Sequence, residues 1–260
     1  MPELTIIFPE EFRRFVRPRK RDLNIRYVVD RKTSVKDIIE ALGVPHTEVG
    51  RITAGGESVG FDWIPTDSNR IHIRPITPPF DVTKPSFLRP IPFSGLRFIV
   101  DVNVGKLALL LRILGLDTEY TNTLGDREIA ERAESEQRIV LSKDTGLLKR
   151  NQVVFGRHIQ SVRPDDQLVE VVRFFGIQGP FQPFSRCLRC NQVLEPVEKA
   201  DILHRLQPKT KKYFNRFKTC PDCDRIYWNG SHLDLMKERL AKAGIYLTNC
   251  PVHTGSNEPS

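Results

Sequence analysis

The chain has 260 residues, of which 39% are hydrophobic and 28% are charged, so it can form packed cores over two or three small domains. Its formal net charge of +8 favours a polyanionic partner, with nucleic acid the first candidate. The longest apolar run, 107–116, contains Arg112 and is far shorter than the roughly 20 residues of a membrane span. The first residues also lack the basic start of a secretory signal, so we expect a cytoplasmic protein with no membrane partner.

Residues 1–76 have the element order of a ubiquitin-like β-grasp domain: two strands, a helix and two further strands. Strands are expected at 4–8, 24–29, 49–54 and 70–74. A helix is expected over 34–43, because Ser34 is a suitable N-cap and Gly43 is suitable to end it. No diglycine ends this domain, so we expect it to bind a protein partner or to brace its neighbour.

The next region is rich in proline and then changes to alternating strands and helices. Six prolines between 75 and 92 predict an extended, non-helical linker, placed at 77–94. From 95 to 180 the alternation indicates an α/β domain with a parallel sheet and helices on both faces. Strands are expected at 96–100, 118–120, 138–142 and 158–162, and helices at 105–114, 126–136, 145–150 and 165–175.

Two of these strands end at an aspartate, the first at Asp101 and the third at Asp144. Carboxyl ends of parallel strands share one edge of the sheet, where such folds place their active sites. A right-handed crossover brings the helix that starts at Asp126 back to the same edge. Three carboxylates repel one another, and Mg²⁺ or Mn²⁺, which prefer oxygen ligands, would hold them together. The structural alternatives are a turn role for Asp101 and an N-cap role for Asp126.

Basic residues flank the same loops. Lys106 and Lys143 are expected to hold phosphate groups near the acids. For Arg112 and Lys149 we favour a simpler role on solvated helix faces. A site of this composition would activate a water molecule and stabilise the charge that develops on a phosphate during in-line displacement.

Residues 181–247 contain two C-x-x-C pairs, the form of a zinc ribbon. The four expected zinc ligands are Cys187, Cys190, Cys220 and Cys223. Two such knuckles give tetrahedral sulfur coordination of a structural Zn²⁺, and the presence of a second pair weakens the alternative of a redox dithiol. A short helix is expected at 231–243, a disordered tail at 248–260, and a free thiol at Cys250.

Between the cysteine pairs, basic residues interleave with aromatic ones. We expect Lys211, Lys212 and Arg216 to hold nucleic-acid phosphates, while neighbouring rings stack on bases. The equal alternative is that Tyr213, Phe214 and Phe217 pack on the zinc knuckles and the charges face water.

Several segments together resemble the Mut-7 C-terminal RNase domain family, which is PIN-like. They are DVNVGKLA at 101–108, LRILGLDT at 111–118, DRE at 126–128 and IVLSKD at 139–144. The resemblance covers about 96–244 and implies metal-dependent RNA cleavage by an acidic cluster; a ubiquitin-like domain ahead of it is a known companion. The chain departs from the family at Gly125, where an acid is usual, and at Asn103 and Val104, for which no consequence is expected.

PIN-like sites often use four acids, and Asp165 or Asp166 is a candidate for the fourth, although we favour helix capping for both. The overall prediction is a β-grasp domain, a PIN-like α/β domain and a zinc ribbon that together form a metal-dependent ribonuclease. The alternatives are a non-catalytic RNA-binding or adaptor protein and a phosphohydrolase of small molecules.

Overall fold

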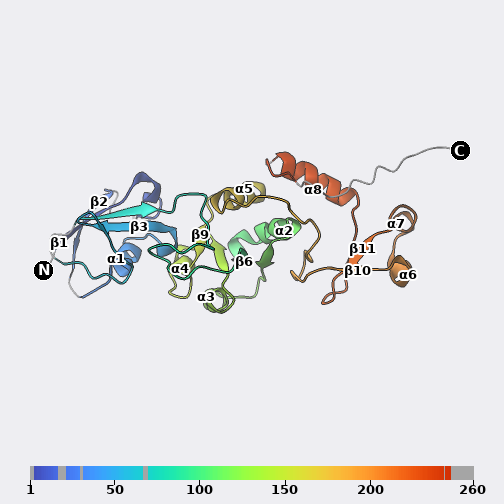
Figure 1. The fold of residues 1–260 in the computed structure, drawn as a ribbon, viewed down its shortest axis with the longest axis horizontal. Helices are drawn as coiled ribbons and strands as arrows, with labels where there is room; N and C mark the ends of the chain where they lie inside the picture. The colour runs from blue at the N-terminus through green and yellow to red at the C-terminus, as the bar shows by residue number, and fades with distance from the viewer. Residues whose placement is uncertain (1–2, 17–21, 30–31, 67–69, 243, 247–260) are drawn as a thin grey trace.

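The computed structural model describes residues 3–16, 22–29, 32–66, 70–242 and 244–246 (Figure 1). Three parts follow one another along an elongated molecule: a mixed sheet, a parallel sheet with helices, and a small antiparallel sheet. The strands are β1 (Glu3–Ile7), β2 (Asn24–Val28), β3 (Val49–Ala54), β4 (Glu57–Ser58), β5 (Arg70–Pro75), β6 (Arg97–Val100), β7 (Asp117–Glu119), β8 (Ile139–Ser142), β9 (Gly156–His158), β10 (Glu195–Val197), β11 (Phe217–Thr219) and β12 (Ile226–Tyr227). The α-helices are α1 (Val35–Ala41), α2 (Gly105–Ile113), α3 (Asp126–Ser135), α4 (Thr145–Leu148), α5 (Pro164–Phe174), α6 (Lys199–Ile202), α7 (Pro208–Tyr213) and α8 (Ser231–Lys242).

The N-terminal sheet has the strand order β2-β1-β5-β3-β4, with β1 parallel to β5 and the other neighbours antiparallel. This is the mixed, ubiquitin-like sheet expected from the sequence, with α1 packed on one face. Ser34 caps α1 by accepting a hydrogen bond from the backbone N–H of Asp37, and Gly43 follows the helix with φ 117°. The sequence analysis missed β4, because a two-residue strand after the Gly55-Gly56 turn shows no alternation.

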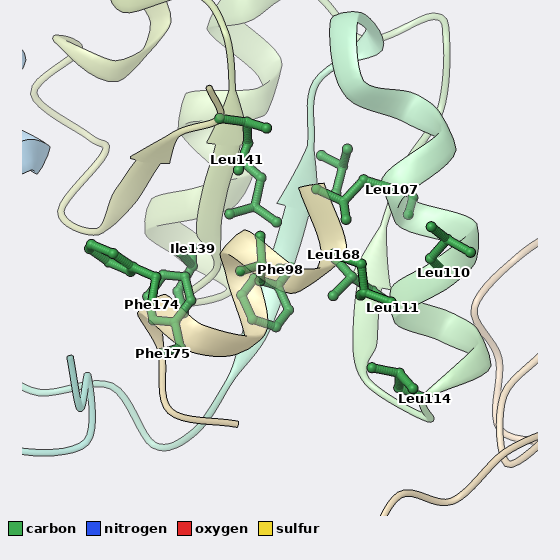
Figure 2. Close-up of a cluster of buried hydrophobic side chains, with 14 of the residues drawn as sticks. Phe98, Leu107, Leu110, Leu111, Leu114, Ile139, Leu141, Leu168, Phe174 and Phe175 are labelled. Atoms are coloured by element: carbon green, nitrogen blue, oxygen red, sulfur yellow. The ribbon is translucent and has the colours of Figure 1, made fainter. Parts of the chain in front are cut away.

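The central sheet has the order β7-β6-β8-β9, and all its neighbouring strands are parallel. Alternate residues point to opposite faces. Phe98 and Leu141 pack with α2 and α5 on one face (Figure 2), whereas Ile99 and Val140 pack with α3 and α4 on the other. A strand that is buried on both faces reads as a continuous apolar run, which is why β6 and β8 were evident in the sequence.

The last strand of this sheet begins earlier than expected, at Gly156 rather than at His158. Gly156 lies under two neighbouring elements: a Cβ there would come within 2.7 Å of Leu148 Cδ2 and 3.3 Å of Thr47 Cγ2. The strand therefore starts with a residue that has no side chain, and the apolar alternation becomes visible only after it.

The proline-rich segment is non-helical, as expected, but it is not a free linker, because its side chains pack into both neighbouring domains. Arg89 is buried between them and donates hydrogen bonds to the carbonyl oxygens of Val49 (2.9 Å), His46 (2.9 Å) and Val154 (3.1 Å). Burial lowers the pKa of Arg89 to about 10, so the guanidinium still carries its charge at neutral pH. The first two domains are thus joined through a buried polar contact.

This contact gives a stability prediction. Arg89→Met keeps most of the side-chain volume but leaves three buried carbonyl oxygens without donors, so we expect the free energy of unfolding to fall by about 3 kcal/mol or more. Urea unfolding of the full chain measures it. Arg74→Met, at an exposed position of β5, is the matched control and should change stability by no more than about 0.5 kcal/mol. Equal effects of the two substitutions would contradict the role of Arg89.

The C-terminal part forms an antiparallel sheet with the order β10-β11-β12, followed by α8. The chain after the sheet turns back, because Leu240 and Ile245 are buried in the same cluster as the α2–α5 face of the central domain. The ribbon is therefore held at both of its ends by the central domain. The expected tail at 248–260, Cys250 included, lies outside the described residues.

Candidate active site and metal centre

Asp101 is a buried carboxylate at the carboxyl end of β6. Its backbone N–H extends the sheet by donating to Leu141 O (3.0 Å), and its side chain is 5% exposed. Carboxylate oxygen Oδ2 accepts hydrogen bonds from Ser142 Oγ (2.6 Å) and from the Asn103 side-chain amide. Asp101 also begins the turn Val102–Val104, where its carbonyl oxygen accepts from the Val104 N–H (3.0 Å), so the turn role is confirmed. That role uses the backbone alone and does not require the carboxylate to be buried.

Asp144 follows β8 and is connected to Asp101 through Ser142. The backbone N–H of Asp144 donates to Ser142 Oγ (2.8 Å), which in turn donates to Asp101. Asp144 Oδ1 caps α4 by accepting from the backbone N–H of Gly146 (2.6 Å). The sequence analysis did not single out Ser142, although its position two residues before Asp144 at the end of a buried strand was the available signal.

Asn103 has a role that the sequence analysis did not expect. Its amide donates to Asp101 and to Ser142 Oγ (3.3 Å), and its carbonyl oxygen accepts from the backbone N–H of Lys143 (3.0 Å). Asn103 thus ties the loop after β6 to the loop after β8. Asparagine can form this bridge because its side chain both donates and accepts hydrogen bonds.

Asp126 is the first residue of α3, on the chain that returns from the carboxyl end of β7. The alternative that Asp126 is the N-cap of this helix is wrong, because Gly125 is the N-cap. Glu128 closes the capping box by accepting a hydrogen bond from the Gly125 N–H (3.0 Å). The acid that the family usually places at the Gly125 position is replaced by a residue suited to capping. Asp126 itself is half-buried, and no described residue hydrogen bonds to its carboxylate.

The three aspartates are not brought into direct contact. In the described part of the chain, the four cysteines are the only group of three or more His, Cys, Asp or Glu side chains placed closely enough to hold one metal ion. The donor set still suits Mg²⁺ or Mn²⁺, because Asp101 Oδ1 and Asp144 Oδ2 accept no hydrogen bond from any described residue. Mg²⁺ commonly binds one or two carboxylates directly and keeps several waters, so more distant acids can act through those waters.

The two lysines near this edge differ in exposure. Lys106 is exposed in the first turn of α2, and Lys143 is half-buried between Ser142 and Asp144. Lys149, which was expected to be solvated, instead donates from Nζ to Glu40 O (3.0 Å) in the N-terminal domain. Lys149 therefore belongs to the domain interface, and Lys106 and Lys143 stay candidates for phosphate contacts.

Neither candidate for a fourth acid is a helix cap. Arg163 occupies the N-cap of α5, and Asp165 and Asp166 follow Pro164 in the first turn. Asp166 lies 4.0 Å from the Arg163 guanidinium. The capping role that we favoured for both residues is therefore wrong, and they lie at the start of a helix that follows β9.

The four cysteines form a compact cluster in the ribbon. Their Sγ atoms lie within 4.8 Å of one another, with Cys187–Cys223 and Cys190–Cys220 both at 3.4 Å. A Zn–S bond length of about 2.3 Å implies Sγ–Sγ separations of about 3.8 Å in a tetrahedral site, so the donor set and its spacing fit one Zn²⁺. Each knuckle ends with a residue in the left-handed region, Asn191 (φ 68°) and Asp224 (φ 56°).

The first knuckle is anchored to the central domain. Arg112, in the last turn of α2, is buried and donates to Leu188 O (3.0 Å) and Arg189 O (2.7 Å). Asn191 accepts from the backbone N–H of Thr118 (3.0 Å) and donates to Asp117 Oδ1 (2.8 Å). Arg112 is thus a structural cation, not a solvated one, and the first cysteine knuckle is joined to α2 and β7.

The basic segment of the ribbon lies away from the acidic edge. Lys211 and Lys212 are on α7, Arg216 precedes β11, and this part is beyond the C-terminal end of α2 (Figure 1). The two alternatives for its aromatic residues divide between individual rings: Phe217 is buried in the ribbon core, whereas Tyr213 is 66% exposed.

Comparison with protein families agrees with this architecture. Residues 96–240, more than half of the chain, match the Mut7-C RNAse domain, and residues 1–81 match the Mut7-C ubiquitin domain. The chain belongs to the Mut7-C RNase family. No curated protein and no solved structure matches the chain. Within the described residues, no helix of this family member is long and apolar enough to cross a membrane.

Proposed function

We propose that this Mut7-C chain is a metal-dependent ribonuclease whose acidic site is formed by Asp101, Asp126 and Asp144. The observation that carries the proposal is the buried carboxylate of Asp101, which is linked through Ser142 to Asp144 and keeps one oxygen without a protein partner. That oxygen is open to solvent and not sealed in the core, so a metal ion could reach it. Membership of an RNase family makes RNA the expected substrate.

Each acidic residue has a distinct part in this proposal. Asp101 would bind Mg²⁺ or Mn²⁺ through Oδ1, and Asp144 through Oδ2, while their other oxygens remain fixed by Ser142, Asn103 and Gly146. Asp126 would complete the site from α3. The bound ion would activate a water and stabilise the charge on the scissile phosphate.

The basic residues would hold the RNA. Lys106 and Lys143 lie close enough in sequence to the acids to contact the phosphates around the cleaved bond, and Lys211, Lys212 and Arg216 would hold a more distant part of the strand. The net charge of +8 favours approach of any polyanion, so these contacts supply affinity rather than sequence choice.

The test is cleavage of a labelled single-stranded RNA by the purified full chain, first without added divalent ions and then with Mg²⁺ or Mn²⁺. We expect cleavage only after addition. Chelators are left out because they would also remove zinc. RNA binding without cleavage under all conditions would overturn the proposal in favour of a non-catalytic adaptor, and hydrolysis of a small phosphomonoester but not of RNA would favour a phosphohydrolase.

Ser142 provides a prediction about the arrangement of the site. Ser142→Ala removes the donor to Asp101 and the acceptor for the Asp144 N–H, so we expect cleavage to fall about 10- to 100-fold, the usual range when a group that orients a metal ligand is lost. Ser142→Thr, which keeps the hydroxyl, should retain more activity. Raising the Mn²⁺ concentration should partly restore Ser142→Ala, and a failure of Mn²⁺ to do so would contradict a role in metal binding.

A further inference from the structure

The ribbon contains a groove with aromatic walls. It has a volume of about 590 Å³ and is formed by α7, by residues before the first knuckle and by the chain after the second knuckle. The aromatic residues that line it are Phe184, Tyr213, Phe214, Tyr227 and Trp228. The volume is within the range of small-ligand sites, and every ring offers a flat apolar surface.

The rings of this groove are supported from behind. Trp228 lies 6.3 Å from the buried Phe217 and 6.5 Å from Phe214, measured between ring centroids, so the ribbon core backs the indole. Gly230 leaves space for it, since a Cβ there would come within 2.7 Å of Trp228 Nε1. Tyr213, at 66% exposure, extends the same surface outward. Large rings held in place but left accessible are suited to stacking.

The charge around the groove is positive. Lys209 lines it, Lys211 and Lys212 share α7, and no acidic residue is among those that line it. Lys212 Nζ lies 5.3 Å from the centroid of the Tyr213 ring. In the described part of the chain these lysines form no ion pair with an acid, in contrast to Arg205, which pairs with Asp224 (2.9 Å).

We propose that this groove binds unpaired bases of single-stranded RNA, with Tyr213 and Trp228 stacking on bases and Lys209 and Lys212 contacting phosphates. The inference rests on RNA being the substrate of the proposed ribonuclease. Stacking surfaces combined with unpaired cations match a single strand, whose bases are open and whose backbone is anionic. An apolar peptide would gain nothing from the lysines, and duplex RNA would keep its bases covered.

The groove and the acidic edge are at opposite ends of α2. Asp101 comes just before this helix, whereas Arg112 in its last turn bonds to Leu188, which lines the groove. Nine helical residues at about 1.5 Å each separate the two ends by about 13 Å. An RNA strand held in the groove must therefore extend over several nucleotides to reach the acids. The groove should thus contribute to the binding of long RNAs and not of dinucleotides.

The experiment measures fluorescence anisotropy of a labelled, unstructured 20-nucleotide RNA with the full chain, without added Mg²⁺ or Mn²⁺. Tyr213→Ala is expected to weaken binding about 5- to 100-fold, in line with measured stacking on aromatic residues, whereas Tyr213→Phe should bind like the wild type. Tyr246→Ala is the matched control, because Tyr246 is 67% exposed and does not line the groove. Zinc content verifies that each ribbon is folded.

A second measurement covers the case in which substitutions near Trp228 unfold the ribbon. The chain has two tryptophans, so Trp63→Phe leaves Trp228 as the sole indole, and its fluorescence should be quenched by the RNA but not by an abasic strand of equal length. Wild-type affinity of Tyr213→Ala, or equal binding of abasic RNA, would overturn the groove proposal. Both results are measured on RNA binding alone, so they test the groove whether or not the cleavage expected of the proposed ribonuclease is observed.

Discussion

Asp101→Asn and Asp144→Asn are each expected to lower the rate of RNA cleavage by about 10²- to 10⁴-fold, the effect of losing several kcal/mol of metal-dependent stabilisation. Asparagine has nearly the same shape and can still accept the hydrogen bonds that reach Asp101 from Ser142 and Asn103. The charge that would bind Mg²⁺ or Mn²⁺ is lost. Single-turnover rates with saturating protein measure the change without a contribution from weaker RNA binding.

The control for this prediction is Asp62→Asn, at an exposed position of the N-terminal domain, which should cleave RNA at the wild-type rate. Both site variants should bind RNA at least as tightly as the wild type, because each removes a negative charge near the phosphates. If either site variant keeps full metal-dependent cleavage while remaining folded, the acid concerned does not act in the site. Asp126→Asn then tests the third position in the same assay.

Cys220→Ser is expected to abolish zinc binding and to unfold the ribbon. A structural Zn²⁺ contributes about 10–16 kcal/mol in isolated zinc-binding domains, far more than the two small hydrophobic clusters around this sheet can replace. The zinc content, measured by metal analysis, should fall from about one zinc per chain to none. Backbone amides between 185 and 230 should exchange rapidly with deuterium. Cys250→Ser, at the cysteine outside the C-x-x-C pairs, is the matched control and should keep its zinc.

Loss of zinc should also destabilise the adjoining part of the central domain. Arg112 bonds to the carbonyl oxygens of Leu188 and Arg189, so an unfolded knuckle leaves a buried guanidinium with fewer acceptors. We expect faster amide exchange at the C-terminal end of α2 in Cys220→Ser, while the N-terminal domain, which has its own core, remains protected. Retained zinc, or ribbon amides that stay protected, would contradict the structural role of the metal.

The amino-acid sequence by itself determined those features that depend on local patterns of residues. The mixed N-terminal sheet follows from short-range alternation and capping residues, the buried strands β6 and β8 from continuous apolar runs, and the paired cysteine knuckles from ligand spacing. Asp101 and Asp144 were found in the same way, because each ends a strand whose apolar run is unmistakable. The family motifs lie in these same segments, so the resemblance and the local patterns agree.

What only the tertiary structure decided is how these segments contact one another. The link from Asp101 through Ser142 to Asp144, the Asn103 bridge between two loops, the buried Arg89 and the anchoring of the ribbon by Arg112 all join residues far apart in sequence. A lone serine, asparagine or arginine has no periodic signal, because its role depends on which carbonyl or carboxylate folding brings within 3 Å. For the same reason, the sequence placed basic and aromatic residues together in the ribbon, but the division between the buried Phe217 and the exposed Tyr213 required the packed fold.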